Sequence, residues 1–298
     1  MSWCIVADSS CNLRSFDIDE GAQAEYRFVP LKITVGGREF VDDAQLDVDE
    51  LNRAVSQEKS ASSSSCPSAG EWAEQFRRAD KVIAITISGA LSGSHEAAVM
   101  AQRMVLDEDA AASGSPANRR LHVQDSRAAG GKLEVMVELL ARFIAKHDPS
   151  FDEAVSFLQD LEDHAQVLFS LSSYDNLVKN GRMPRLAGAI ASKLSIRMLG
   201  TASEEGKIKV IGPTRGERKM IRKTIDQMRN DGYQGGLVYI DHVANPQGAG
   251  HLRDAIVEAW PEARVRILPC SGLCSYYAES TGLIIGFEWC DAARDLLA

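Results

Sequence analysis

Serine hydroxyls gather at the ends of several expected strands in this 298-residue chain. The segments that carry them are Asp8-Ser9-Ser10, Ser88-Gly89 with Leu91-Ser92-Gly93-Ser94 behind it, Asp125-Ser126, and the tract SASSSSCPS at 60–68. In an open α/β sheet, ligands bind outside the carboxyl ends of the strands, where the following helices direct free N–H groups toward them. The pattern therefore indicates a site for an anionic head group, although Asp8, Asp125 and Ser92 are also typical of turns and helix caps.

The serine tract allows two interpretations. Ser-rich segments are commonly flexible linkers, whereas a cradle of hydroxyls and backbone N–H groups would hold a ligand. Directly after the tract, the sequence Ser68-Ala69-Gly70-Glu71 fits a capping box, with Ser68 as N-cap and Glu71 at N3. A linker has no need to end in a helix cap, so the residues alone leave both interpretations open.

A serine-dependent enzyme is the alternative from another functional class. Ser92, His95, Asp125 and His242 supply the residue types of a catalytic triad. However, the order around Ser92 is Gly-Ala-Leu-Ser-Gly, which is not the G-x-S-x-G nucleophile elbow. No G-x-G-x-x-G follows the first strand and no Walker A sequence is present, so no motif supports nucleotide binding. A hydrolase or acyltransferase that acts on a small acyl ester through Ser92 remains the alternative to a binding protein without catalysis.

The composition is that of a globular protein whose main partners are not polyanions. A formal net charge of −9 argues against nucleic acid and anionic membrane surfaces. No apolar run approaches the roughly 20 residues that span a bilayer, and the N-terminus lacks the features of a secretion signal. The six cysteines form no C-x-x-C pair and have no zinc-like spacing. The sequence thus predicts a cytoplasmic protein with reduced thiols, no metal and no membrane span.

Strands and helices alternate along the first half of the chain. Strands are expected at 4–9, 26–41 (with a hairpin turn at Gly36-Gly37), 81–87 and 121–126, and helices from Val48, through Trp72 and Phe76, from Gly93, and over 132–146. A surface loop is expected at 107–118. This alternation predicts a mostly parallel sheet with helices on both faces.

A domain boundary is expected near 150–165, which gives an N-terminal α/β domain of residues 1–160 and a C-terminal α/β domain of residues 161–298. The second half is expected to hold strands at 166–171, 237–243, 263–269 and 283–289, a hairpin around 204–206, and helices that end at Gly181, run over 185–199, pass through Met220 and Met228, and cover 247–260. Asn245 and Pro246 are typical N-cap and N1 residues for the last of these helices.

The ordered motifs of the chain resemble those of the DegV family. The matching segments are DSS at the end of the first strand, VPLKITVGGREFVDD, SSCPSAGEW, ISGALSGSHEAA, VQDSRAAGG and YDNLVKNGRMPRLAGAIASKLSIRML. Members of this family are bacterial fatty-acid-binding proteins, and several are the acyl-binding subunit of fatty acid kinase. The resemblance implies two α/β domains, the first with a mostly parallel sheet flanked by helices and the second smaller, with one long-chain fatty acid in a tunnel between them. It also implies that the chain uses no cofactor and is not itself an enzyme, but presents the fatty acid carboxylate to a partner kinase that forms acyl-phosphate.

The same resemblance implies which residues hold the carboxylate. In the family, the positions that correspond to Ser64-Ser65 and to Ser92 hydrogen-bond the fatty acid. Gly93 and Ser94 belong to the same expected helix start as Ser92, so we add them to the predicted head-group site. The serine tract would then be half of a carboxylate cradle rather than a linker.

One residue of the family pattern is missing from this chain. Many members have a His in an H-T-G-P-G-like segment near the last strand, where this sequence reads YYAESTG at 276–282. Tyr277, Ser280 or Thr281 could replace that His as a head-group contact. His95, next to Ser94, is a further candidate.

Basic residues that could meet a partner protein lie on one expected helix. They are Arg215, Arg218, Lys219, Arg222 and Lys223, a spacing that places them on a single helix face. Such a stripe is either a solvated face or a docking surface for the kinase. Arg182, at the family's G-R position, is the other docking candidate. The predicted docking residues are therefore Arg182, Arg218 and Arg222.

Overall fold

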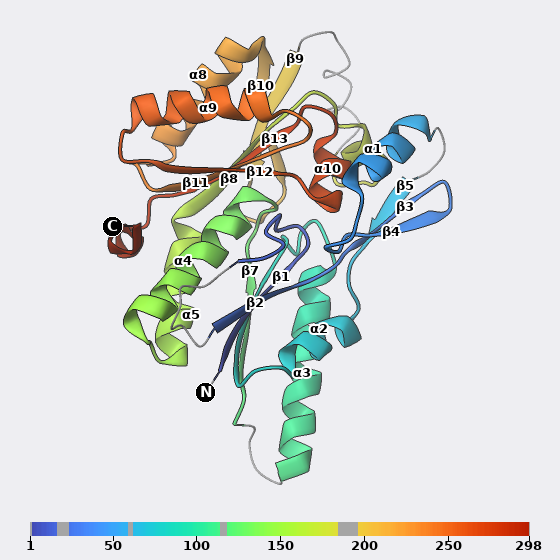
Figure 1. Ribbon diagram of the computed structural model, residues 1–298, viewed down its shortest axis with the longest axis vertical. Coiled ribbons are helices and arrows are strands. Elements are labelled where there is room, and N and C mark those ends of the chain that lie inside the picture. The colour runs from blue at the N-terminus through green and yellow to red at the C-terminus, as the bar shows by residue number, and fades with distance from the viewer. Residues whose placement is uncertain (1, 17–23, 59–61, 114–117, 184–195, 298) are drawn as a thin grey trace.

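Two large sheets lie on either side of one buried helix, α4, in the computed structural model of this chain (Figure 1). The structure describes residues 2–16, 24–58, 62–113, 118–183 and 196–297. Within these residues, no helix is both long enough and apolar enough to cross a membrane.

The first sheet is entirely parallel. Its strands are β1 (Trp3–Asp8), β2 (Ala24–Val29), β6 (Lys81–Thr86) and β7 (Arg120–Asp125), in the order β2-β1-β6-β7. Helices cover both of its faces: α2 (Ala69–Phe76) and α3 (Ser94–Ser113) on one side, α4 (Gly131–His147) and α5 (Phe151–Asp163) on the other. Alternate residues of β1 face opposite sides, so Ile5 packs in the core with α4 while Val6 packs in the core with Trp72 of α2. The predicted parallel sheet flanked by helices is confirmed.

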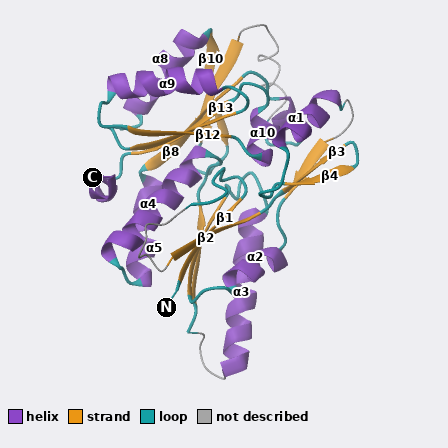
Figure 2. Ribbon diagram, viewed as in Figure 1, coloured by secondary structure: helices purple, strands orange, loops and turns teal. Residues whose placement is uncertain are grey.

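The second sheet has six strands and is mostly antiparallel. They are β8 (Ala165–Leu171), β9 (Ile196–Ala202), β10 (Ile208–Arg215), β11 (Leu237–His242), β12 (Arg264–Pro269) and β13 (Leu283–Glu288), in the order β10-β9-β8-β13-β11-β12. Only the β11–β12 pair is parallel. Helices α8 (Glu217–Asn230) and α9 (Pro246–Ala259) cover its outer face, and α4 lies against its inner face (Figure 2).

Helix α4 packs against both sheets. At Gly131 its backbone lies directly against the backbone of the second sheet. A Cβ atom on Gly131 would lie 2.2 Å from the backbone nitrogen of Gly286 in β13, so no other residue fits at this crossing. The helix is buried continuously from Gly131 to Ala141. The two halves of the chain therefore share one core.

The serine tract forms a strand. A small antiparallel sheet contains β3 (Lys32–Val35), β4 (Arg38–Val41) and β5 (Ser62–Ser65), in the order β4-β3-β5, with the predicted turn at Gly36-Gly37 between β3 and β4. Helix α1 (Val48–Gln57) and helix α10 (Gly272–Ala278) pack on this sheet. The capping box predicted for Ser68 and Glu71 is present at the start of α2. The remaining elements are α6 (Asp175–Lys179) and the 3₁₀ helix η1 (Asp291–Leu297).

Two predicted elements were wrong in part. The expected loop at 107–118 begins as helix, because α3 continues to Ser113 through Asp, Glu and Ala residues, of which Ala and Glu favour helix. The expected helix at 185–199 does not extend over its last residues, because β9 begins at Ile196 and pairs with both β8 and β10. Residues 185–195 lie outside the described part of the chain. Helix α10 was not predicted.

Candidate functional site

A cavity of about 300 Å³ lies between the carboxyl ends of the first sheet and the inner face of the second. Residues after β2, β6 and β7 line it from the first half, and β8, β9, β10 and β13 line it from the second. The apolar side chains in its wall include Leu31, Ile87, Leu91, Val167, Phe169, Leu171, Leu177, Ile208, Leu273 and Ile284. The wall is thus built for an apolar molecule.

Polar groups in the wall include the serine strand and its neighbours. Ser64, Ser65, Ser92, Gly93, Arg182 and Tyr277 all line the cavity. Side chains alternate along β5, so Ser62 and Ser64 point to the same side, toward α10. Ser64 Oγ lies 2.7 Å from the hydroxyl oxygen of Tyr277, and Ser62 Oγ lies 2.7 Å from that of Tyr276. The strand thus fixes the Ser64 hydroxyl beside a phenol.

The loop before α3 brings Ser92 to the cavity. The backbone N–H groups of Leu91 and Ser92 both donate to the carbonyl of Ser88, which folds the chain into a tight turn after β6. Ser92 Oγ accepts a hydrogen bond of 3.3 Å from the N–H of Ser94, so its own O–H remains able to donate. Gly93 leaves room for Cys66, since a Cβ at Gly93 would lie 3.3 Å from Cys66 Sγ. Ser92 thus lines the cavity and also accepts a hydrogen bond from the first residue of α3.

Ser94 has a different role from the predicted one. Its hydroxyl donates to the carboxylate of Asp8 at 2.7 Å, and that carboxylate also accepts from the N–H of Ile87 and from Ser10. Both Ser94 and Asp8 are fully buried, and burial raises the pKa of Asp8. Ser94 does not line the cavity. It anchors the start of α3 to the end of β1 and so positions Ser92.

Tyr277 and Arg182 line the cavity together with Ser64 and Ser92. The Arg182 guanidinium lies 6.0 Å from the centre of the Tyr277 ring, and its Nε donates to the carbonyl of Leu91 at 3.2 Å. Burial raises the pKa of Tyr277, which keeps its phenol protonated and able to donate. Arg182, which the sequence analysis assigned to partner docking, is thus a wall residue that bridges from the second half of the chain to the Ser92 loop.

The other candidates for the missing His lie outside the cavity wall. Thr281 Oγ1 accepts a hydrogen bond of 3.0 Å from Arg197, and the carbonyl of Ser280 accepts one of 2.8 Å from Ser172, in the turn before β13. His95 Nδ1 lies 3.2 Å from Thr86 Oγ1. None of Ser280, Thr281 and His95 lines the cavity, so Tyr277 is the only one of the four candidates that does.

The residue types of a catalytic triad are present but not assembled. The Asp125 carboxylate accepts from the backbone N–H groups of Gly89 and Arg127. His242 accepts at Nδ1 from the N–H of Asn245, and burial lowers its pKa. Neither His95 nor His242 forms a hydrogen bond with Ser92 among the described residues. Neither of these two histidines is therefore placed as a general base for the Ser92 hydroxyl.

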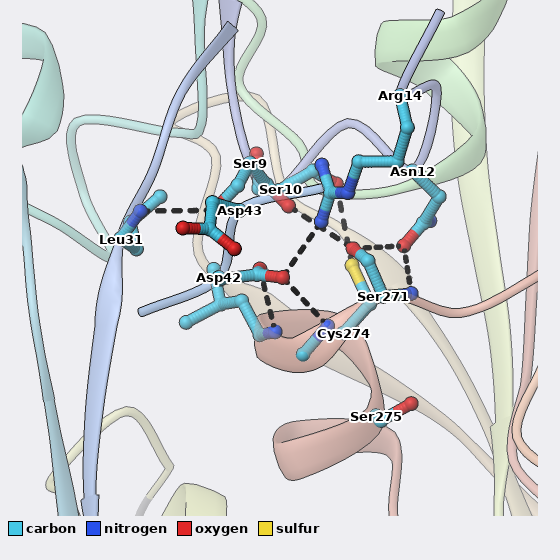
Figure 3. Close-up of polar contacts among 12 residues, drawn as sticks. Ser9, Ser10, Asn12, Arg14, Leu31, Asp42, Asp43, Ser271, Cys274 and Ser275 are labelled. Atoms are coloured by element: carbon cyan, nitrogen blue, oxygen red, sulfur yellow. Dashed lines mark hydrogen bonds and ion pairs between the residues drawn. The ribbon is translucent and has the colours of Figure 1, made fainter. Parts of the chain in front are cut away.

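Helix α10, which carries Tyr277, is fixed to the first half of the chain by buried polar contacts (Figure 3). Asn12 Oδ1 accepts from the N–H and the hydroxyl of Ser271, at 2.8 and 2.9 Å. The Asp42 carboxylate accepts from the N–H groups of Gly272 and Leu273 at the start of the helix, at 2.8 and 2.9 Å. These contacts set the position of Tyr277 opposite β5.

Arg218, Lys219, Arg222 and Lys223 of the predicted basic stripe lie on α8, on the outer face of the second sheet, whereas Arg215 is the last residue of β10 rather than part of a helix. Arg218 and Arg222 are exposed, and Arg222 lines a shallow groove with Arg215, Lys219 and Lys223. None of these side chains lines the cavity. The stripe is thus separate from the cavity.

Comparisons with known proteins match the chain over almost its whole length. The family model described as "Uncharacterised protein, DegV family" matches residues 2–286. A DegV domain-containing protein of Streptococcus pyogenes serotype M1 is 38% identical over 288 residues, which cover 97% of this chain and 100% of that protein.

Solved structures show the same fold. The fatty acid kinase (Fak) B3 protein of Streptococcus pneumoniae, loaded with linoleic acid, has a TM-score of 0.91 and 37% identity, covering 97% of this chain and 99% of that one. A DegV family protein of Eubacterium eligens, loaded with heptadecanoic acid, has a TM-score of 0.89 and 31% identity, covering 96% and 99%.

Proposed function

This chain belongs to the DegV family, and we propose that it binds one long-chain fatty acid in the cavity between its two halves. The observation that carries the proposal is the form of the cavity, which has an apolar wall and a cluster of hydroxyl groups from β5, the Ser92 loop and α10. The similar proteins that hold linoleic and heptadecanoic acid support the same ligand class. We take the N-terminal domain as residues 1–160 and the C-terminal domain as residues 161–298.

The carboxylate would lie among Ser64, Ser92, Tyr277 and Arg182. A buried carboxylate is unfavourable unless it accepts several charge-assisted hydrogen bonds. The Ser92 hydroxyl and the hydrogen-bonded Ser64–Tyr277 pair each supply a donor, the Gly93 N–H at the helix start adds another, and the Arg182 guanidinium supplies a positive charge within the same wall. The set matches one singly charged head group.

The acyl tail would provide most of the affinity. Burying one methylene contributes about 0.8 kcal/mol, so fourteen methylenes give an upper limit on the order of 11 kcal/mol. A hydrogen bond to a charged group adds about 1.5–3 kcal/mol. The tail therefore sets how tightly the ligand binds, and the head-group contacts set which way it points.

The chain would act as a non-catalytic cytoplasmic subunit that uses no cofactor. In this role it presents the bound carboxylate to a fatty acid kinase, which forms the acyl-phosphate. The unassembled triad supports this reading over hydrolysis, because within the described residues neither His95 nor His242 forms a hydrogen bond with Ser92. The exposed basic stripe on α8 is the surface that we assign to the kinase.

Charge reversal on α8 distinguishes docking of the kinase from binding of the fatty acid. Arg218→Glu combined with Arg222→Glu is expected to leave fatty acid affinity unchanged but to reduce acyl-phosphate formation with the kinase, because exposed interface charges govern association. Arg253→Glu on α9, an exposed arginine on the neighbouring helix, is the matched control. Affinity is measured by lipid titration and acyl-phosphate by hydroxamate formation. Full acyl-phosphate formation by the double variant, at low and at physiological salt, would rule out α8 as the docking surface.

Fatty acid binding is expected to be independent of pH between about 6 and 7.5, the range in which an ordinary histidine titrates. None of the described residues in the cavity wall is a histidine, and the raised pKa of Tyr277 keeps it neutral in this range. Titrations at several pH values, with the wild type and with His95→Ala, test this. A step that disappears in His95→Ala would assign the head group to His95 instead.

The Phe169–Gly200 pair is expected to set the fit of the acyl tail. Phe169 on β8 lines the cavity, and its ring lies across Gly200 on β9: a Cβ at position 200 would be 2.2 Å from Cε2 of the ring. Gly200→Ala must displace the ring along the cavity face, whereas Phe169→Ala removes it. We expect Gly200→Ala to favour shorter fatty acids and Phe169→Ala longer ones. The affinity should change about fourfold for each methylene that is gained or lost from the cavity.

The measurement is competition between saturated fatty acids of increasing length, with thermal unfolding as a control for folding. The double variant Phe169→Ala/Gly200→Ala has no ring to displace, so it should prefer longer chains again. If all three variants kept the wild-type preference, the pair would have no part in tail recognition.

A further inference from the structure

Three side chains capable of binding a metal meet where the end of α5 approaches the segment after β13, away from the cavity. Asp160 lies on α5, His164 is the residue that ends this helix, and Cys290 follows β13. None of them lines the cavity. Within the described residues, they are the one group of three or more His, Cys, Asp or Glu side chains close enough to share an ion.

The distances between their donor atoms suit a small tetrahedral ion. Cys290 Sγ lies 3.2 Å from Asp160 Oδ2, and His164 Nδ1 lies 3.1 Å from Asp160 Oδ1. The three ligand atoms all lie within 4.8 Å of one another. Zinc bonds of about 2.0–2.3 Å at tetrahedral angles place ligand atoms roughly 3.3–3.6 Å apart, so the exposed Asp160 and His164 side chains would move toward the Cys290 thiol to share one ion.

The backbone holds these ligands together without a metal. Asp160 and His164 are separated by one helical turn, which places them on the same face of α5. The N–H of Trp289 donates to the carbonyl of His164 at 2.9 Å, and the N–H of Cys290 donates to the Glu288 carboxylate at 2.8 Å. The Trp289–His164 bond thus joins the end of α5 to the segment after β13, and the Glu288 carboxylate fixes the backbone of Cys290 within that segment.

We propose that Asp160, His164 and Cys290 bind a zinc ion that links α5 to the C-terminal segment. A thiolate, an imidazole and a carboxylate together favour zinc over magnesium or calcium, which prefer oxygen ligands only. The side chains of Asp160 and His164 are 48% and 45% exposed, so water can reach the fourth position. The thiolate and the carboxylate balance the two positive charges of the ion.

The binding step releases one proton. Zinc replaces the hydrogen of the Cys290 thiol, and that proton goes to solvent. His164 binds as the neutral ring: the hydrogen now on Nδ1, directed to the Asp160 carbonyl at 2.7 Å, moves to Nε2 on the exposed side. No oxidation or reduction takes place, and the site is independent of the fatty acid.

Cobalt substitution tests the proposal on the full-length reduced protein. One equivalent of Co²⁺ should give the thiolate-to-cobalt absorption and the visible bands of tetrahedral cobalt, and Zn²⁺ should remove both by displacement. Cys290→Ser and His164→Ala should each abolish the thiolate–cobalt signal or weaken it at least tenfold. Cys66→Ser, which removes the one exposed cysteine among the described residues, is the matched control and should keep the cobalt signal.

A second measurement covers the case in which a variant folds poorly. Zinc is expected to raise the thermal unfolding temperature of the wild type and of Cys66→Ser, but not that of Cys290→Ser, while fatty acid binding stays the same in Cys290→Ser. A thiolate–cobalt signal that persists in Cys290→Ser, or no such signal in the wild type, would overturn the proposal.

Discussion

Replacing Ser92 by alanine is expected to weaken fatty acid binding by roughly 10- to 150-fold without changing the fold. The estimate follows from the loss of one hydrogen bond to a charged group, which is worth about 1.5–3 kcal/mol. The Ser92 hydroxyl lines the cavity. Its oxygen accepts a hydrogen bond from the Ser94 N–H, so its own hydrogen can be donated to the head group. Because the bond is to the charged head group, methyl esters of the same fatty acids should lose much less affinity on Ser92→Ala.

Ser64 carries the second hydroxyl of the site, and its neighbour Ser63 on the same strand provides a matched control. Ser64→Ala should produce a loss similar to that of Ser92→Ala, because Ser64 lines the cavity and contacts Tyr277. Ser63→Ala, one residue earlier and exposed on the other side of β5, should have no effect. Isothermal titration with a long-chain fatty acid measures all three. Equal affinities for Ser63→Ala and Ser64→Ala would remove Ser64 from the carboxylate site.

Glu134→Gln is expected to stabilise the protein at pH 8 by on the order of 3 kcal/mol, and by little near pH 4. Glu134 on α4 and Asp241 at the end of β11 are fully buried. One oxygen of Glu134 and both oxygens of Asp241 have no hydrogen-bond partner among the described residues. Burial raises the pKa of both carboxyls, that of Glu134 to about 7, and the nearby Glu134 charge raises the pKa of Asp241 further.

The direction of the effect follows from proton binding. The unfolded chain loses its Glu proton near pH 4.3, whereas the folded chain holds it up to about pH 7, so the wild type loses stability as pH rises between these values. Gln at position 134 carries no proton to lose and keeps its stability over the same range. Urea unfolding at pH 5 and pH 8 measures the difference, with the exposed Glu74→Gln as control. A Glu134→Gln protein that is less stable than the wild type at pH 8 would contradict this account.

Local sequence signals predicted most of the fold, and long-range pairing explains where they failed. The helix starts at Ser68 and Asn245 were correct, because a cap depends only on residues within one turn. The order of strands in the second sheet was not predictable from the alternation of strands and helices, because β13, the last strand in sequence, inserts between β8 and β11. The serine tract gives no strand signal of its own, and it becomes a strand because it pairs with β3.

The residues that line the cavity were predictable where a motif carried them. Ser64 and Ser92 came from motifs of the family resemblance, and both line the cavity. Ser94 was assigned to the ligand because sequence does not show that a hydroxyl is already bonded to a buried carboxylate. Arg182 was assigned to the surface because its contact with the Leu91 carbonyl joins segments 91 residues apart. The position of Tyr277 depends on α10, which is fixed by contacts from Asn12 and Asp42 far away in the sequence.

Native mass spectrometry of the purified protein, with no lipid added, tests the central claim most directly. We expect one adduct per chain with the mass of a long-chain fatty acid, which is released on denaturation and identified by fragmentation. Its occupancy should fall in Ser92→Ala and remain unchanged in Ser63→Ala. A wild-type protein that carries no acyl chain, and that gains none when incubated with fatty acids, would contradict the account.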